Sequence, residues 1–253
     1  MTQKRLNEIL ELHEKWLQNE IGGKQANLSG LDLSGLDFSG RNLINAIFCN
    51  VDLFGTNFYK ANIYRAEFSG ASFVSANLNK VDASYAYFID SNFTETDMVG
   101  ANLFKANFSK SKFIRTNICR ANFAGANLLA AKFIAVLYNE HTAFFALQCP
   151  EKGSFIGFKK AGGKIIELLI TEDAKRSSAT SRKCRCSKAK VLSITEIDGS
   201  ESELKSITSD YDETFVYTIG EEVNVPDFDE NRWRECSTGI HFFMTRDEAV
   251  RYN

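Results

Sequence analysis

Residues 101–120 read ANLFK ANFSK SKFIR TNICR, four five-residue units in which a small residue is followed two positions later by a large apolar one. The same register extends outward from Ala26 to Ala135 and gives 22 consecutive units without insertion or deletion. The first position is Ala in 12 units, the second is Asn or Asp in 16, and the third is Phe in 11 and Leu in 7. A period of five fits neither an α-helix nor a flat strand. It predicts a chain that turns a right angle every five residues and closes one square coil every twenty.

Each position of the unit has a predicted environment. The first and third residues are expected to point inward, where stacked coils form ladders of Ala and of Phe or Leu. The second residue, Asn or Asp, suits a corner because its side chain can hydrogen-bond its own backbone. The fourth and fifth residues are expected to face solvent.

This pattern resembles the pentapeptide-repeat family, whose members form a right-handed quadrilateral β-helix, and the resemblance covers 110 of 253 residues. Taken with the flanking segments, the predicted fold is mainly β: a pentapeptide-repeat solenoid with an N-terminal capping helix and a small α+β C-terminal domain. The predicted domains are the capping helix at 1–25, the β-helix of 22 repeats at 26–135, a cap or linker at 136–150, and an α+β domain of unknown function at 151–253.

Both ends of the solenoid need a cap, because an uncapped coil exposes unpaired backbone and apolar side chains. Residues 3–20 are predicted to form an amphipathic helix over the first coil, with His13 packed in its apolar stripe. Apolar residues at 136–147 fall out of register and are expected to cap the last coil or to contact a second chain. The stripe of the N-terminal helix comprises Leu6, Ile9, Leu10, His13, Trp16 and Leu17.

Residues 151–253 lose the repeat and show runs rich in Ile, Val, Phe and Tyr, which predict strands. Thr245 and Glu248 have the spacing of a capping box that opens a short helix. The segment is therefore predicted to be a small α+β domain with its own core. The predicted strands are 154–160, 164–170, 190–197, 213–219 and 239–244.

Residues 174–188, AKRSSATSRKCRCSK, place six basic residues beside five hydroxyls. Such a segment could hold a phosphate, since Arg and Lys supply charge and Ser and Thr supply short donors. The alternative is a solvated, flexible loop. A phosphate-bearing small molecule or a nucleotide is the expected ligand class. The candidate ligand-binding residues are Arg176, Ser177, Ser178, Arg182, Lys183 and Arg185, with Cys236 and His241 farther along the chain.

Cys236 and His241 lie five residues apart across a glycine turn, and these residue types would allow a nucleophile and a base. No third orienting group is evident, so no catalytic residue is assigned and the protein is expected not to be an enzyme. Zinc bound by Cys149, Cys184, Cys186 and Cys236 is another alternative, but Cys-x-Cys is not the usual zinc-knuckle spacing. Buried structural thiols, without a metal or cofactor, are the default interpretation.

The whole of residues 151–253 resembles an uncharacterised domain found behind pentapeptide repeats in bacterial and phage proteins, and two segments carry the resemblance. They are RSSATSRKCR at 176–185 and CSTGIHFF at 236–243. The resemblance implies no activity. Whether the source is bacterial or phage stays open.

The overall charge and the absence of sorting signals restrict the partners and the compartment. The formal net charge is −2, which is too balanced to indicate bulk nucleic-acid binding. No segment approaches the roughly 20 apolar residues of a membrane span, so no membrane partner is expected. The charged N-terminus is not a secretory signal. Six Cys in a chain that can bury its own core are expected to be reduced thiols in the cytoplasm.

The best-understood pentapeptide-repeat proteins mimic duplex DNA and bind type II topoisomerases, so the resemblance implies this activity as an alternative function. A DNA mimic needs an acidic rod. Residues 26–135 carry eight acids and ten bases; residues 26–100 have a net charge of 4 − 8 = −4, and residues 101–135 one of 6 − 0 = +6. This distribution disfavours the mimic.

The favoured prediction is a non-enzymatic scaffold or binding protein. A narrower form of this prediction is a phage-encoded protein that acts on a host system. A β-helix face and a C-terminal recognition domain would engage an unidentified protein partner or a phosphate-bearing ligand. A homodimer is a further alternative, and a nucleotide-binding or catalytic C-terminal domain is another. Two outward columns at twenty-residue spacing are the candidate interaction surface. Their apolar members are Phe54, Val74, Ile114 and Ile134 in one column and Tyr64 and Phe104 in the other.

Overall fold

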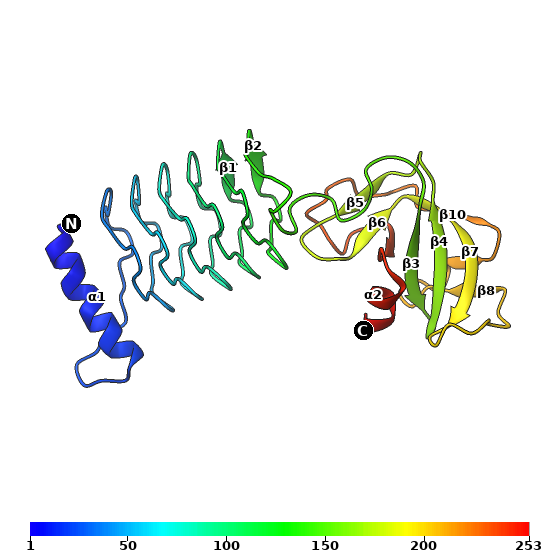
Figure 1. Cartoon of the computed structure of the whole chain (residues 1–253), viewed down its shortest axis with the longest axis horizontal. Coiled ribbons are helices and arrows are strands. Elements are labelled where there is room, and N and C mark those ends of the chain that lie inside the picture. Colours follow the sequence, from blue (N-terminus) through cyan, green and yellow to red (C-terminus); the bar gives the residue numbers. More distant parts are fainter. Residues whose placement is uncertain (253) are drawn as a thin grey trace. The chain divides into compact units, whose positions relative to one another are not determined.

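The repeat region forms the square solenoid that its period predicts, and the computed structural model describes residues 1–252 (Figure 1). Parallel backbone bridges join each unit to the unit twenty residues later, as in Asn57 with Asn77 and Asn77 with Asp97. The ladder lengthens into strands at β1 (Lys112–Ile114) and β2 (Lys132–Ile134). The predicted fold class is confirmed: the chain is mainly β and built around a β-helix.

The solenoid interior is a stack of aromatic rings, as the third position of the repeat predicts. Phe73 and Phe93 stack with ring centroids 5.0 Å apart, and Phe93 and Phe113 repeat the same spacing one coil later. Rings on adjoining sides meet edge to face, as Phe88 and Phe93 do at 5.4 Å. Such offset and edge contacts add to the area that each ring buries.

Asn has its predicted role at the corners of the coils. The backbone conformation of the fifth residue of each unit was not predicted. Asn57 Oδ1 accepts a hydrogen bond from the Tyr59 amide at 3.1 Å and another from Asn77 Nδ2 at 3.0 Å. The fifth residue has a left-handed backbone, for example φ 57° at Lys60. This conformation explains why Gly occupies that position in seven of the 22 units. The fourth residue is half-buried in the middle coils rather than fully exposed, because its neighbours one coil away partly cover it.

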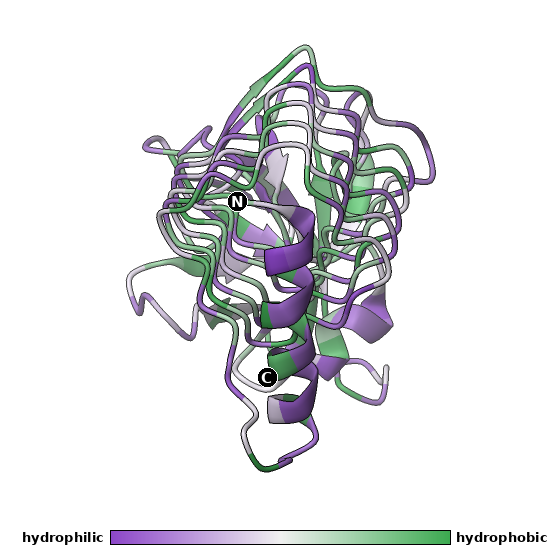
Figure 2. Ribbon diagram, turned by 90° about the vertical axis from the view of Figure 1, so that its left-hand side faces the viewer, coloured by the Kyte–Doolittle hydropathy of each residue, from purple (hydrophilic) through white to green (hydrophobic). Residues whose placement is uncertain are grey.

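Helix α1 (Gln3–Leu17) caps the first coils, as predicted, and ends three residues earlier than expected. Thr2 is its N-cap and accepts a hydrogen bond from the Arg5 amide. Leu6, Leu10 and His13 are buried beneath it. The amide of Ala26 donates to His13 Nδ1 at 3.1 Å, so this histidine ties the helix to the first repeat. Figure 2 shows the helix lying across the stacked coils, which superimpose in that view.

Residues after the repeat close the other end of the solenoid. Phe145 is buried, and its ring centroid lies 5.5 Å from that of Phe123 and 5.2 Å from that of Phe133. Thr142 Oγ1 donates to the Ile118 carbonyl at 3.2 Å. The chain divides into two units, Met1–Ala146 and Leu147–Asn253. The predicted boundaries at 25/26, 135/136 and 150/151 stay predictions.

The C-terminal unit has a four-stranded antiparallel sheet, a three-stranded one and a hairpin. The sheet order is β10-β7-β4-β3 in the first and β11-β6-β5 in the second, and β8 pairs with β9. Helix α2 begins after Thr245, which forms the predicted capping box with Glu248. Strands β5, β6, β8 and β10 were not predicted. The bounds are β3 (Phe155–Ala161), β4 (Lys164–Ile170), β5 (Arg176–Ser178), β6 (Cys184–Cys186), β7 (Lys188–Glu196), β8 (Ser206–Thr208), β9 (Val216–Thr218), β10 (Glu222–Asn224), β11 (Ile240–Phe242) and α2 (Arg246–Arg251).

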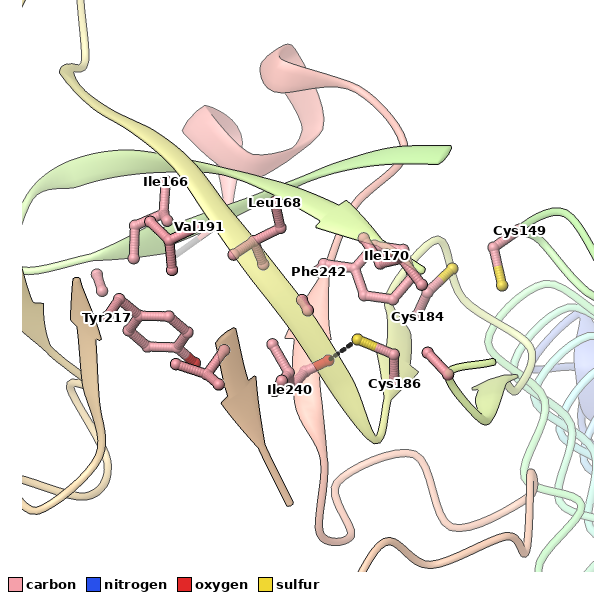
Figure 3. Packing of buried hydrophobic residues seen from close by; sticks show 14 residues of the cluster. Cys149, Ile166, Leu168, Ile170, Cys184, Cys186, Val191, Tyr217, Ile240 and Phe242 are labelled. Carbon is pink, nitrogen blue, oxygen red and sulfur yellow. Dashed lines mark hydrogen bonds between the residues drawn. The ribbon is translucent and has the colours of Figure 1, made fainter. Parts of the chain in front are cut away.

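The core of the C-terminal unit lies between these sheets (Figure 3). Ile166, Leu168 and Val191 come from the large sheet, and Phe242 from β11. Gly157 approaches Phe242 so closely that an added Cβ would lie 2.6 Å from its ring. Within residues 1–252, no helix is long and apolar enough to cross a membrane.

Candidate ligand-binding cavity

The C-terminal unit contains a cavity of about 640 Å³ that adjoins a smaller one of about 130 Å³. A volume of this size falls within the range of small-molecule binding sites. Aromatic side chains, among them Phe215 and Tyr217, form part of the wall of the larger cavity, which Asp212 and Asp227 also line. Five residues line both cavities and therefore mark their junction: Lys159, Lys183, Tyr211, His241 and Tyr252.

Lys159 is the most deeply buried charged group of the junction, with only 8% of its surface exposed. It belongs to β3, in which Gly157, Lys159 and Ala161 alternate on the buried face. Its Nζ lies 5.7 Å from the ring centroid of Tyr217. Among residues 1–252 it makes no ion pair and its Nζ has no hydrogen-bond acceptor, although it lines both cavities. Burial lowers the pKa of Lys159, and the charge of Asp210 opposes the shift.

His241, from β11, adds a neutral acceptor to the junction. Burial lowers its pKa to about 4, and the charges of Lys183, Lys159 and Arg185 act in the same direction. The ring is therefore uncharged at neutral pH. Its Nε2 is buried and has no hydrogen-bond partner within the described residues. An orphaned buried polar atom at a cavity wall is a group that a ligand can satisfy.

Lys183, at the junction, contacts Cys236, which lines the larger cavity. Lys183 Nζ lies 3.5 Å from Cys236 Sγ and 5.6 Å from the ring centroid of Tyr252. Burial lowers the pKa of Lys183, but its electrostatic attraction to Cys236, Tyr252 and Glu235 is stronger, and the net effect is a raised pKa. Lys183 is thus held as an ammonium. The thiol of Cys236 contacts this lysine and not His241 Nε2, so no nucleophile–base hydrogen bond forms.

One wall of the cavity is the irregular segment 226–239, which Arg185 holds in place. The Arg185 guanidinium donates to the Thr238 carbonyl at 2.7 Å and to the Asn231 carbonyl at 3.1 Å. It also lies 5.3 Å from the ring centroid of Phe228. Arg185 is 2% exposed, so its charge is used inside the fold rather than offered to a ligand.

Arg176 has a similar structural role, and the interpretation of residues 174–188 as a solvated loop is wrong. The segment forms the hairpin β5–β6, with Ser177, Ser178 and Arg185 buried. Arg176 donates to backbone carbonyls in two turns, Pro150 and Gly153 in one and Thr171 and Glu172 in the other. These carbonyls lie in irregular backbone, and a guanidinium with five donors satisfies them together.

The remaining predicted ligand residues also lie apart from the junction. Ser178 Oγ accepts from the Gln148 amide at 2.8 Å. Arg182 Nε donates to Glu248 at 2.6 Å. Of the eight candidates, Lys183 and His241 line both cavities and Cys236 lines the larger one. Arg185 pairs with His241 across the strands and Ser177 pairs with Arg185, but neither Arg185 nor Ser177 lines a cavity. Lys159 was missed, because two adjacent lysines at the end of a strand suggest exposed residues. The alternation of β3 places Lys159 on the same face as Gly157 and Ala161, and this is the signal that could have found it.

The cysteines do not gather as a metal site. All six are free, and Cys149, Cys184 and Cys186 belong to the apolar cluster while Cys236 is exposed (Figure 3). Burial raises the pKa of Cys186 to about 12. Within the described chain, no group of three or more His, Cys, Asp or Glu could hold a metal ion. The three buried thiols therefore act as small apolar residues.

The six predicted surface residues of the solenoid form two distinct columns. In the column of Tyr64 and Phe104, cations cover the rings: Arg65 lies 5.1 Å from the Tyr64 centroid and Lys105 lies 5.3 Å from the Phe104 centroid. Among residues 1–252, no cation lies over a ring of the other column. The members of this other column are Phe54, Val74, Ile114 and Ile134.

Comparison with sequence families divides the chain in the same way as its repeat. Residues 32–70, 66–109 and 101–136 match the profile of pentapeptide repeats. Residues 145–249 match a family of unknown function, DUF5758. No curated protein sequence matches the chain.

Several solved structures resemble the solenoid. The pentapeptide repeat protein Rfr23 of the cyanobacterium Cyanothece 51142 is 20% identical with a TM-score of 0.29, over 52% of this chain and 95% of the other. A pentapeptide repeat protein of the Arabidopsis thaliana thylakoid lumen is 26% identical with a TM-score of 0.25, over 41% of this chain and 68% of the other. QnrB1, a plasmid-mediated fluoroquinolone resistance protein, is 14% identical with a TM-score of 0.22, over 46% of this chain and 92% of the other.

Proposed function

This chain is a pentapeptide-repeat protein with a C-terminal domain of a family of unknown function, and we propose that it is a non-enzymatic binding protein. Its C-terminal domain would capture a small phosphate-bearing ligand, and its solenoid would serve as a rigid interaction surface. The free state of all six cysteines supports a reducing compartment such as the cytoplasm. The observation that carries the ligand proposal is the unpaired ammonium of Lys159.

An unpaired buried charge is costly, so its retention needs a reason. Removing an ammonium from water costs several kcal/mol unless a partner compensates. Among residues 1–252 Lys159 has no ion pair and no hydrogen-bond acceptor, and the charge of Asp210, which lines the smaller cavity, compensates it only in part. Its side chain lines both cavities. An anion at the junction would supply the missing partner, and Lys183 would supply a second cation.

The other groups at the junction favour a phosphate ester with an aromatic body. The phosphate would lie between Lys159 and Lys183, where charge-assisted hydrogen bonds are strongest. The aromatic walls at Phe215 and Tyr217 would accept a planar group in the larger cavity. The neutral His241 Nε2 would accept a hydrogen bond from an N–H or O–H of the ligand. A nucleotide combines these features.

The test is calorimetric titration of the full chain with nucleoside 5′-monophosphates and with the matching nucleosides. We expect binding of at least one nucleotide and at least ten-fold weaker binding of its nucleoside. Lys159→Met should weaken nucleotide binding at least ten-fold, whereas the exposed Lys190→Met, on β7, should leave it unchanged. Native mass spectrometry of the protein purified from cells adds a direct search for a retained ligand.

Two results would overturn the proposal. One is equal nucleotide binding by wild type and Lys159→Met. The other is the absence of binding across the nucleotide panel together with a ligand-free mass spectrum. Loss of binding through misfolding is separable, because Lys159→Met removes a buried charge and should raise the thermal stability of the empty protein.

A further inference from the structure

One side of the square solenoid separates charge along the rod. Bridges join Asp32 to Asp52, Asp52 to Ser72 and Ser72 to Asn92, and the same ladder continues to Lys112 and Lys132. The second positions of this side therefore form one straight column. Its two acids lie at the front, its two bases at the back, and neutral residues lie between them. Asp32, Asp52, Lys112 and Lys132 are all exposed.

An apolar column runs beside this charged one, two residues along in each unit. Phe54 is 54% exposed and Ile134 is 56% exposed, with Val74 and Ile114 half-buried between them. Four of the six side chains in this column are apolar, and apolar side chains gathered along one face of a rod usually mark a contact surface. We call the two columns together the gradient face. Its apolar column comprises Ser34, Phe54, Val74, Thr94, Ile114 and Ile134.

The other three sides lack this separation of charge. Their second positions carry Asn, acids, Ile or Tyr, with no Lys or Arg in any of them between residues 26 and 130. Basic residues on those sides stand at the fifth position, as Lys60 and Lys80 do, or at the first, as Arg41 does. The gradient is thus a property of one face and not of the repeat.

We propose that the gradient face binds a second copy of this chain in antiparallel orientation. A two-fold axis that lies in the interface, perpendicular to the rod, makes the two rods run in opposite directions. Each column then faces the same column of the partner. Asp32 then meets the partner's Lys132, and Asp52 meets the partner's Lys112. In the apolar column Phe54 meets the partner's Ile114.

Antiparallel docking is favoured over parallel docking by the same charges. A two-fold axis along the rod would place the second position of a unit opposite the fifth position of the same unit. Lys112 would then face the partner's Arg115, a cation that Glu95 already pairs on the same side. Parallel docking therefore offers the Lys112 ammonium no acid of its own, whereas antiparallel docking offers Asp52. The antiparallel arrangement places complementary charges at both ends of the charged column and pairs Phe54 with the partner's Ile114 in the column beside it. Because only one side of the rod takes part, the interface is small, and we expect a dimer of micromolar affinity that weakens with salt.

Sedimentation velocity over a concentration series tests self-association in low and high salt. We expect a reversible dimer at 50 mM salt whose dissociation constant rises at least ten-fold at 500 mM. The double variant Lys112→Glu plus Lys132→Glu should be monomeric over the same range, because the new carboxylates would then face the partner's Asp52 and the partner's Asp32 at both ends of the interface. Lys60→Glu plus Lys80→Glu, which makes the same charge change on another side, should still dimerise.

Cross-linking tests the orientation. Ser34→Cys and Ile134→Cys protein, mixed and oxidised, should yield a disulfide between position 34 of one chain and position 134 of the other. A 34-to-34 disulfide in place of this one would show parallel docking and overturn the proposal. A wild-type chain that stays monomeric at all concentrations in low salt would overturn it as well. Neither experiment depends on a ligand of the C-terminal cavity, so its failure leaves the proposed function untouched.

Discussion

The two halves of the chain differ in what they bury. The solenoid buries hydroxyls whose bonds are satisfied by a fixed rule: Thr96 Oγ1 donates to the Phe73 carbonyl, and Thr116 Oγ1 to the Phe93 carbonyl, 23 residues back in both cases. The C-terminal unit buries the charges of Lys159 and Arg185. A satisfied hydroxyl adds stability at little cost, whereas a buried charge costs stability unless it is compensated. This difference agrees with the proposed function, in which the C-terminal unit binds the ligand and the solenoid serves as a rigid scaffold.

The largest expected effects come from removing one ring from each core. Phe88 stacks on Phe68 and Phe108, and Phe242 lies at the centre of the C-terminal core. Phe88→Ala and Phe242→Ala should each lower the free energy of unfolding by about 3–5 kcal/mol, because each removes a fully buried ring and leaves a cavity. We expect each loss to be confined to its own unit.

The two tryptophans make this measurable. Trp16 belongs to α1 of the solenoid unit, and Trp233 to the C-terminal unit. Urea unfolding of single-tryptophan proteins, with Phe at the other site, reports each unit separately. Equal shifts of both signals by either alanine variant would contradict the division and show one cooperative fold.

The same contrast explains how far the sequence predicts the structure. In the solenoid the same five positions repeat, so every unit shows again which residues fit each environment. The coil and its inward ladders follow from this repeat, and the N-terminal cap with His13 follows from the helical spacing of its apolar residues. In the C-terminal unit each position occurs once. Strands β5 and β6 were missed because their basic and hydroxyl residues indicate a solvated loop. Arg176 and Arg185 satisfy carbonyls from distant turns, and no local pattern encodes such contacts.

A matched pair of arginines tests this explanation with a smaller effect. Arg185→Met should lower the free energy of unfolding of the C-terminal unit by about 2–3 kcal/mol, because two charge-assisted hydrogen bonds to the 226–239 segment are lost. Arg65→Met should change that of the solenoid by less than about 0.5 kcal/mol, since this exposed arginine contributes only its contact with Tyr64 and Tyr85. Thermal unfolding of the three proteins gives the comparison. A cost for Arg65→Met as large as that for Arg185→Met would show that the contrast in buried charge does not govern stability.

The smallest effect that sharpens the comparison is the pH dependence of the C-terminal unit. The pKa of His241 is about 4 in the folded protein and about 6.5 in the unfolded chain, so the unfolded state binds the proton first as pH falls. Stability contributed by the neutral ring is complete above about pH 6.5 and is lost as pH falls towards 4. Because part of the ring reaches solvent, we expect this loss to be on the order of 1–2 kcal/mol rather than the full value of the shift.

Trp233 fluorescence during urea unfolding at several pH values measures this loss, and His241→Asn should remove it between pH 6.5 and 4. Burial also lowers the pKa of His13, so the solenoid has a titration of its own, which Trp16 reports separately. The carboxyls of Asp229 and Glu248 have lowered pKa values and lose their contribution only at still lower pH. A wild-type C-terminal unit whose stability stays flat between pH 6.5 and 4 would mean that His241 is not held neutral by burial. The junction would then lack its proposed acceptor, and the assignment of binding chemistry to this half of the chain would rest on Lys159 and Lys183 alone.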